Sequence, residues 1–179
     1  MRADARRNRE RILVAAGAAF SSYGTDAQMD DVARAAGVGV GTVYRHFPTK
    51  EALLADLVRR KFEIFAANAR EVLQAGGDPW DALTGLLRRN AEIMARDLAV
   101  QQAMVGSVAS WKAAAAERAE LQMLGAELVE RAKRSGQLRA DFTVDDIPLI
   151  MCGVSSTMAA GDFDWRRHLE LSLDGMRAR

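Results

Sequence analysis

Apolar residues recur every three to four positions along most of the chain, the spacing that gathers them on one face of an α-helix. In the first half this pattern predicts helices over about 5–23 and 29–36, a short helix that ends before Pro48, and a long helix from Lys50 past residue 73. Further helices are predicted over 79–94, 98–111, 114–135, 147–160 and 165–176. We therefore expect an all-α fold of about nine helices.

Glycine, proline and small polar residues stand where these stripes stop. Gly24 and Gly37 follow the first two stripes as C-caps, and Gly76-Gly77 ends the long helix. Asp78 before Pro79 predicts an N-cap with proline in the first helical position. The segment from Thr143 to Asp146 resembles a capping box that opens the helix over 147–160.

The segment from Met29 to Lys50, MDDVARAAGVGVGTVYRHFPTK, predicts two helices joined by a tight turn at Gly37. This is the arrangement of a helix-turn-helix, whose second helix enters the DNA major groove. A plain helical hairpin in a bundle is the alternative. A dinucleotide-binding loop is rejected, because Thr42 or Tyr44 stands where the third glycine is needed and no strand precedes.

Small and donor-rich side chains make the second of these helices the candidate DNA contact. Glycine lets a helix lie close to a polyanion, and hydroxyl, guanidinium and imidazole groups can donate to phosphates or base edges. We expect Thr42, Tyr44, His46 and Lys50 to contact the DNA backbone, and Gly39, Val40, Gly41 and Arg45 to lie near bases or phosphates. Gln28, in the loop before the first helix of the pair, is a further candidate.

Residues 29–54, MDDVARAAGVGVGTVYRHFPTKEALL, resemble the DNA-binding domain of the TetR (tetracycline-repressor) family of transcriptional regulators. The similarity covers roughly residues 8–60, and many members carry Ser or Thr where Gly39 and Gln28 stand. The resemblance implies an all-helical homodimer with a three-helix DNA-binding head and a larger C-terminal effector domain. It also implies that a ligand bound in that domain loosens DNA binding. We accordingly predict a DNA-binding domain over 1–48 and a ligand-binding and dimerisation domain over 49–179.

Charge is distributed unevenly between the two parts. Residues 1–61 hold 11 Lys and Arg against 7 Asp and Glu, a net charge of +4, whereas the whole chain carries +1. Five arginines fall within the first eleven residues: Arg2, Arg6, Arg7, Arg9 and Arg11. They indicate either a solvated helix start or tail, or a flexible basic arm that touches phosphates or the minor groove. Arg59, Arg60 and Lys61 are expected to be solvated charges.

Several classes of protein are excluded by what the sequence lacks. The single Cys152 excludes an internal disulfide framework or a zinc cage, and we expect it to be buried. No catalytic motif is found and no cofactor is expected, so the chain is not predicted to be an enzyme. No apolar leader or membrane-length run is present, which predicts a cytoplasmic protein without a membrane partner.

The helix over 147–160 is almost wholly apolar and should be buried on every side, a partner subunit being a natural cover. We therefore expect a homodimer through the last two helices. The methionines of the central helices could equally be core filler and Asn90 a satisfied core amide, but the family resemblance favours an apolar effector pocket between the helix from Lys50 and the helix over 147–160. The candidate lining residues are Trp80, Asn90, Met94, Met104, Ser107, Trp111, Met123, Met151 and Ser155.

Together these features predict a transcriptional regulator, a ligand-released repressor that binds a palindromic operator in double-stranded DNA as a dimer. Its expected partners are that operator and an apolar small-molecule effector. The alternatives are a helical small-molecule sensor that does not bind DNA, and a transcriptional activator.

Overall fold

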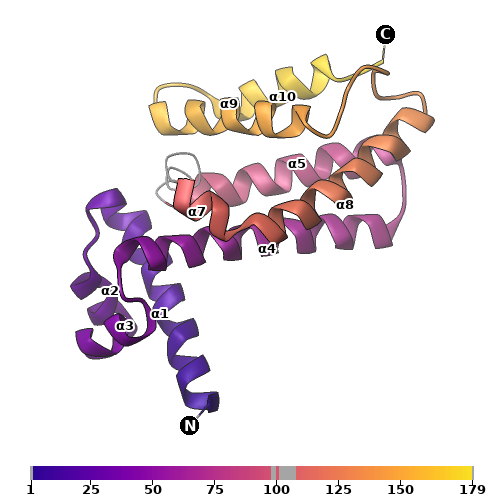
Figure 1. The fold of residues 1–179 in the computed structure, drawn as a ribbon. Coiled ribbons are helices and arrows are strands. Elements are labelled where there is room, and N and C mark those ends of the chain that lie inside the picture. The colour runs from indigo at the N-terminus through magenta and orange to yellow at the C-terminus, as the bar shows by residue number, and fades with distance from the viewer. Residues whose placement is uncertain (1, 98–99, 101–107, 179) are drawn as a thin grey trace. The chain divides into compact units, whose positions relative to one another are not determined.

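The computed structural model describes residues 2–97, 100 and 108–178 of the chain. Within these ranges it is all-helical, with one isolated bridge between Leu138 and Arg177, which confirms the predicted fold class (Figure 1). The helices are α1 (Arg2–Tyr23), the 3-10 helix η1 (Gly24–Asp26), α2 (Met29–Ala36), α3 (Val40–His46), α4 (Lys50–Ala75), α5 (Pro79–Arg96), α7 (Val108–Ala113), α8 (Ala115–Arg134), α9 (Asp146–Ala160) and α10 (Trp165–Gly175). Most of the helix expected over 98–111 lies outside the described residues.

The chain forms two compact units. The first contains Met1–Lys61 and Asp97–Ala115, and the second contains Phe62–Arg96 and Ala116–Arg179. Helix α4 is continuous and contributes residues to both units. The boundary between residues 48 and 49 that the sequence suggests stays a prediction.

The first unit is built on a head in which α1, α2 and α3 pack against one another (Figure 1). Ile12 and Phe20 of α1 are buried, as are Val32 of α2, Val43 of α3 and Phe47. Within α2, Val32, Ala33 and Ala36 are buried, whereas Ala35 is exposed. Burial of these side chains fixes which face of α3 points outward.

The helix ends follow the predicted caps. Gly24 has φ 61° and Gly37 has φ 64°, the left-handed conformation that glycine adopts cheaply. Thr49 Oγ1 accepts a hydrogen bond from the Ala52 amide at 3.1 Å. Asp78 Oδ1 accepts hydrogen bonds from the amides of Trp80 and Asp81, both at 2.9 Å.

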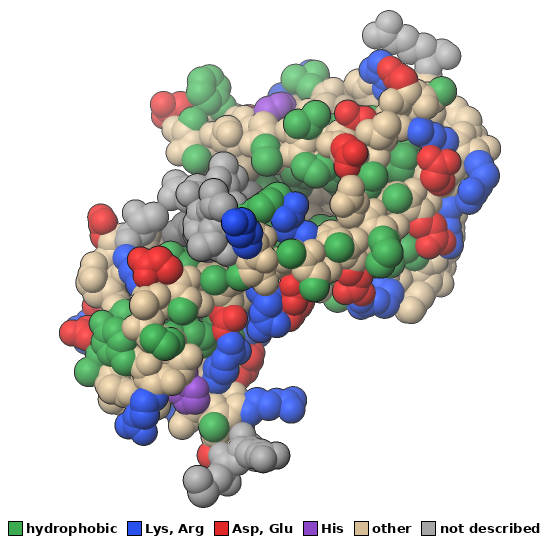
Figure 2. Space-filling model, in the orientation of Figure 1, with side chains coloured by type: hydrophobic (Ala, Val, Ile, Leu, Met, Phe, Trp, Pro, Cys, Tyr) green, Lys and Arg blue, Asp and Glu red, His purple; other side chains and the backbone are tan. Residues whose placement is uncertain are grey.

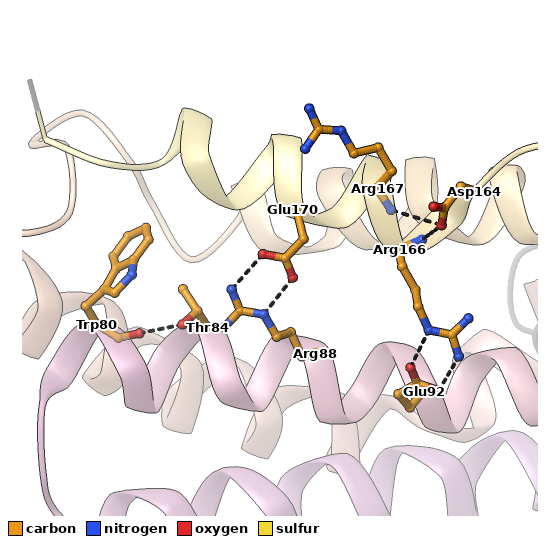
Figure 3. A network of polar contacts seen from close by, with 8 residues as sticks. All are labelled: Trp80, Thr84, Arg88, Glu92, Asp164, Arg166, Arg167 and Glu170. Carbon is orange, nitrogen blue, oxygen red and sulfur yellow. Dashed lines mark hydrogen bonds and ion pairs between the residues drawn. The ribbon is translucent and has the colours of Figure 1, made fainter.

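The second unit contains the C-terminal part of α4 together with α5, α8, α9 and α10, and α9 and α10 lie side by side (Figure 1). Its core is apolar, with Leu83 of α5, Leu128 of α8, Val154 of α9 and Leu173 of α10 almost inaccessible to solvent. Two bidentate ion pairs join α5 to α10, one between Arg88 and Glu170 and one between Glu92 and Arg166 (Figure 3).

Two expectations about individual side chains are wrong. Lys61 is not a solvated charge, because its side chain is only 4% exposed and its Nζ lies 2.9 Å from Asp97 Oδ2. Cys152 is exposed rather than buried. Helix α9 is only partly covered by its own chain, since Leu149 is 71% exposed, so its cover by a partner subunit stays a prediction. Periodicity identifies an apolar helix but does not say which of its faces another helix covers.

Candidate nucleic-acid interface

The turn between α2 and α3 is set by backbone hydrogen bonds around Gly37. The Gly37 amide donates to Arg34 O at 3.2 Å, and the Val38 amide donates to Ala33 O at 3.1 Å. These two bonds with a left-handed glycine form a Schellman motif, which satisfies carbonyls left open at the end of a helix. The turn therefore ends α2 at a defined residue and places Gly39 as the N-cap of α3.

Helix α3 has one buried and one exposed face. Val43 is inaccessible to solvent, and Phe47 directly after the helix is 2% exposed. Val40, Gly41, Tyr44 and Arg45 are exposed, with Val40 at 41% and Tyr44 at 48%. These four residues are one helical turn apart in pairs, so they share a single outward face.

The two glycines of α3 are not required by packing inside the chain. A Cβ atom added to Gly39 or Gly41 would meet nothing within 4 Å, and neither residue has a positive φ. Because glycine has no side chain, another molecule can approach the backbone closely at both positions. Arg45 lies along the helix, with its Nε donating to Gly41 O at 3.2 Å.

The remaining DNA candidates lie at the edges of this face. Thr42, His46 and Lys50 are half-buried, and Lys50 Nζ lies 5.6 Å from the centre of the Phe20 ring. Gln28 is exposed as the N-cap of α2, where its backbone N–H donates to Asp31 Oδ2 at 3.0 Å. Contact of any of these residues with DNA stays a prediction.

Sequence reasoning did not single out the roles of Arg9 and Arg11, which lie in the helical part of α1. Arg11 Nη2 donates to the carbonyl oxygen of Ala36 at 2.7 Å. The guanidinium of Arg9 lies 5.1 Å from the centre of the Phe47 ring and forms an ion pair with Asp56. Nothing in the local sequence signals these partners, since each lies more than 20 residues away along the chain.

The effector candidates are dispersed. Trp80, Asn90, Met94 and Ser155 are buried in the second unit and Met151 is half-buried, whereas Met123 is 69% exposed on α8. Trp111 belongs to the first unit and is 38% exposed. Met104 and Ser107 lie outside the described residues. Three of the candidates, Trp80, Asn90 and Met94, lie buried on α5. Asn90 and Met94 are one helical turn apart and so share a face of this helix.

Asn90 has a buried polar partner. Asn68 Nδ2 of α4 donates to Asn90 Oδ1 at 2.9 Å, and the two residues are 5% and 7% exposed. An amide pair of this kind satisfies part of the hydrogen-bonding capacity of each side chain, because each primary amide offers two donors and two acceptor lone pairs. The pair therefore accounts for a polar residue in an otherwise apolar stripe.

None of the helices among the described residues is both long enough and apolar enough to span a membrane. Within the same ranges, no group of three or more His, Cys, Asp or Glu side chains is placed to hold a metal ion.

Comparisons with known proteins agree with this geometry. The profile of bacterial regulatory proteins of the tetR family matches residues 12–57, and that of the SbtR-like transcriptional regulator C-terminal domain matches residues 78–178. Over 100 residues the chain is 39% identical to the HTH-type transcriptional repressor KstR of Mycolicibacterium smegmatis, a match that covers 55% of this chain. The chain spans 49% and 63% of the length of the two curated KstR repressors that it matches.

Solved structures extend the likeness to the whole chain. The crystal structure of a TetR transcription regulatory protein from Mycobacterium vanbaalenii is 35% identical, with a TM-score of 0.72 and 99% of both chains covered. FadR of Bacillus subtilis, solved in complex with stearoyl-CoA, has a TM-score of 0.71 over 93% of this chain and 98% of its own, but at 18% identity it shares the fold alone. From its helix-turn-helix to its C-terminal bundle, the chain belongs to the TetR family of bacterial regulatory proteins.

Proposed function

We propose that the protein is a ligand-responsive transcriptional repressor that binds an operator in double-stranded DNA. The observation that carries this proposal is the outward face of α3, where Val40, Gly41, Tyr44 and Arg45 are exposed while Val43 anchors the helix to the head. Glycine without a packing reason, next to hydroxyl and guanidinium donors, suits close approach to the phosphate backbone and base edges.

The repressor acts as a homodimer through α9 and α10. Leu149 of α9 is 71% exposed, Phe163 between the helices 68% and Leu171 of α10 54%. Figure 2 shows hydrophobic side chains at the surface over these two helices. A second copy would bury them, and two-fold symmetry makes the same patch self-complementary. Two heads would then read half-sites about 34–36 Å apart, or a multiple of that, in a roughly palindromic operator.

The effector is a predominantly apolar small molecule that binds in the second unit near Asn90 and Met94. These two residues are buried among apolar side chains of α4 and α5, and the Asn68–Asn90 pair would offer a polar group to an otherwise apolar ligand. The fold neighbour solved with stearoyl-CoA makes molecules with a long apolar chain the first class to screen. Such a ligand releases DNA only if it binds the DNA-free state more tightly.

The test of DNA binding is selection of bound duplexes from a random pool, followed by titration of the recovered sequence. Tyr44→Ala should weaken binding to every sequence alike, because a backbone contact carries no base information. Tyr23→Ala is the matched control, since Tyr23 is 60% exposed at the end of α1 in the same unit. If no duplex is enriched at low salt, the proposed function fails.

The dimer is tested by sedimentation velocity at micromolar concentration. Leu149→Glu should convert the dimer into monomer, because it places a charge on the patch that a second copy covers. Met123→Glu is the matched control, as Met123 is 69% exposed on α8, and it should leave the dimer intact. A monomeric wild-type protein would contradict the proposed assembly.

A further inference from the structure

We propose that Arg11 is a positioning residue for DNA binding: it holds the turn from which α3 begins, and it acts without touching DNA. This inference rests on the proposed function, since the effect on DNA needs a chain that binds DNA. In this proposal Arg11 differs from a residue of a basic arm, because it binds the protein backbone and not a DNA phosphate. The structural support is the hydrogen bond between Arg11 and the backbone of α2.

Arg11 reaches across the head to the end of α2. Its Nη2 donates to the carbonyl oxygen of Ala36, the last residue of α2, at 2.7 Å. The carbonyls of Ala33 and Arg34 are satisfied by the Schellman bonds of the turn, so Arg11 satisfies a further carbonyl at the same helix end. A guanidinium here also lies at the negative end of the α2 dipole, where a cation is favoured.

Arg11 also lies against the glycine of the turn. A Cβ atom added to Gly37 would stand 3.4 Å from Arg11 Nη2, which is van der Waals contact. Only Gly37, Val38 and Gly39 separate the end of α2 from the start of α3. With so few intervening residues, a brace on the Ala36 carbonyl limits the positions that the first turn of α3 can adopt.

The neighbours of Arg11 hold other parts of the head. The guanidinium of Arg9 lies over the ring of Phe47, the residue that follows α3, and forms an ion pair with Asp56 of α4. Glu10 forms an ion pair with Arg60, also on α4. Three successive side chains of α1 thus contact the end of α2, the end of α3 and α4. This part of α1 serves as a brace for the helix-turn-helix.

The expected effect on binding follows from the population of the competent head. The apparent affinity of a protein falls by the fraction of molecules in which the binding conformation is present. If loss of the Arg11 bond leaves α3 in place in one molecule out of ten, the operator dissociation constant rises about tenfold. The number of phosphates contacted is unchanged, so the slope of log affinity against log salt stays the same.

The experiment compares Arg11→Met with Arg6→Met, an exposed arginine earlier in α1, on the operator recovered by selection. Binding is measured by fluorescence anisotropy at several salt concentrations. We expect Arg11→Met to raise the dissociation constant about tenfold without changing the salt slope. A slope reduced by about 0.9 for each lost phosphate contact would overturn the proposal, because Arg11 would then touch DNA directly. An affinity equal to that of the wild type would overturn it as well.

Hydrogen exchange of the DNA-free protein provides the readout that does not depend on DNA. Amides of Val43 and Tyr44 in α3 should exchange faster in Arg11→Met than in the wild type, and at the wild-type rate in Arg6→Met. Unchanged exchange in Arg11→Met would overturn the proposal. If the wild type binds no duplex, the proposed function fails, while exchange still decides whether Arg11 holds α3.

Arg11→Gln serves as a second variant beside Arg11→Met. Glutamine keeps an N–H donor for the Ala36 carbonyl but carries no charge. Affinity and exchange closer to the wild type than those of Arg11→Met support the positioning role. A loss of affinity as large as that of Arg11→Met, together with a reduced salt slope, would assign Arg11 to a phosphate and overturn the proposal.

Discussion

Replacing Asp97 by Asn tests the buried ion pair in the first unit. Lys61 of α4 is 4% exposed, and its Nζ lies 2.9 Å from Asp97 Oδ2, while Ser21 of α1 donates to Asp97 Oδ1 at 2.7 Å. Asp97 directly follows α5, so this carboxylate links α1 and α4 to the start of the segment Asp97–Ala115. The variant keeps the shape of the side chain but removes the charge that faces a buried ammonium.

The expected cost follows from the burial of the two partners. Removing one partner of a fully buried pair costs about 3–5 kcal/mol, and a charged hydrogen bond contributes about 1.5–3 kcal/mol. Because the Asp97 side chain is 34% exposed, we expect a smaller cost than for a fully buried pair, about 2–3 kcal/mol. For a chain of this size that is a fall in Tm of about 5–10 °C.

Thermal unfolding followed by circular dichroism measures this effect. The double variant Lys61→Met with Asp97→Asn should regain most of the loss, since methionine fills a similar volume and leaves no buried charge. Arg7→Met, which breaks the exposed pair with Asp4, is the control and should shift Tm by less than about 2 °C. A Tm of Asp97→Asn within about 1 °C of the wild type would refute the reasoning, as would a double variant no more stable than the single one.

The pH dependence of the same variant gives a second check. Burial of Asp97 opposes its ionised form, but hydrogen bonds from Lys61 and Ser21 outweigh it and hold the pKa of Asp97 below its usual value. A folded-state pKa below the unfolded value, about 3.9, stabilises the protein above that pH, and the stabilisation is lost as pH falls through the folded pKa. The stability difference between wild type and Asp97→Asn should therefore shrink below about pH 4.

Three further variants test local features of the structure. Gly37→Ala should lower the free energy of unfolding by about 1–2 kcal/mol, measured by chemical denaturation, because a residue with a Cβ atom disfavours the left-handed backbone conformation that Gly37 adopts with φ 64°. Asn90→Leu should cost about 1–3 kcal/mol by leaving the Asn68 amide without its partner, and adding Asn68→Leu should recover stability; no recovery would contradict the pairing. Asp164→Ala should lower the stability by about 1 kcal/mol, measured by denaturant titration, because Asp164 Oδ1 accepts the amides of Arg166 and Arg167 at the start of α10 (Figure 3).

The sequence predicted the helices and the helix-turn-helix because both depend on neighbouring residues. A helical stripe repeats within four positions, and a cap is a bond between residues two or three apart. For this reason Lys50 as the start of α4, Gly37 as the end of α2 and Asp78 as the cap of α5 could be read from the chain alone. The exposed face of α3 follows the same helical spacing, since Val43 and Phe47, four residues apart, are both buried and leave Tyr44 and Arg45 exposed.

Only the tertiary structure decided which polar side chains meet. The partners Arg11 and Ala36 are 25 residues apart, Asn68 and Asn90 22, and Lys61 and Asp97 36. Periodicity assigns each side chain to a face of its own helix. It does not say which other helix covers that face, or at which position along the axis the two helices make contact. From the sequence alone, a solvated charge is therefore predicted at Lys61 and part of an arm or tail at Arg11. Burial and partner depend on how distant helices pack, and that information lies in the fold rather than in any short stretch of sequence.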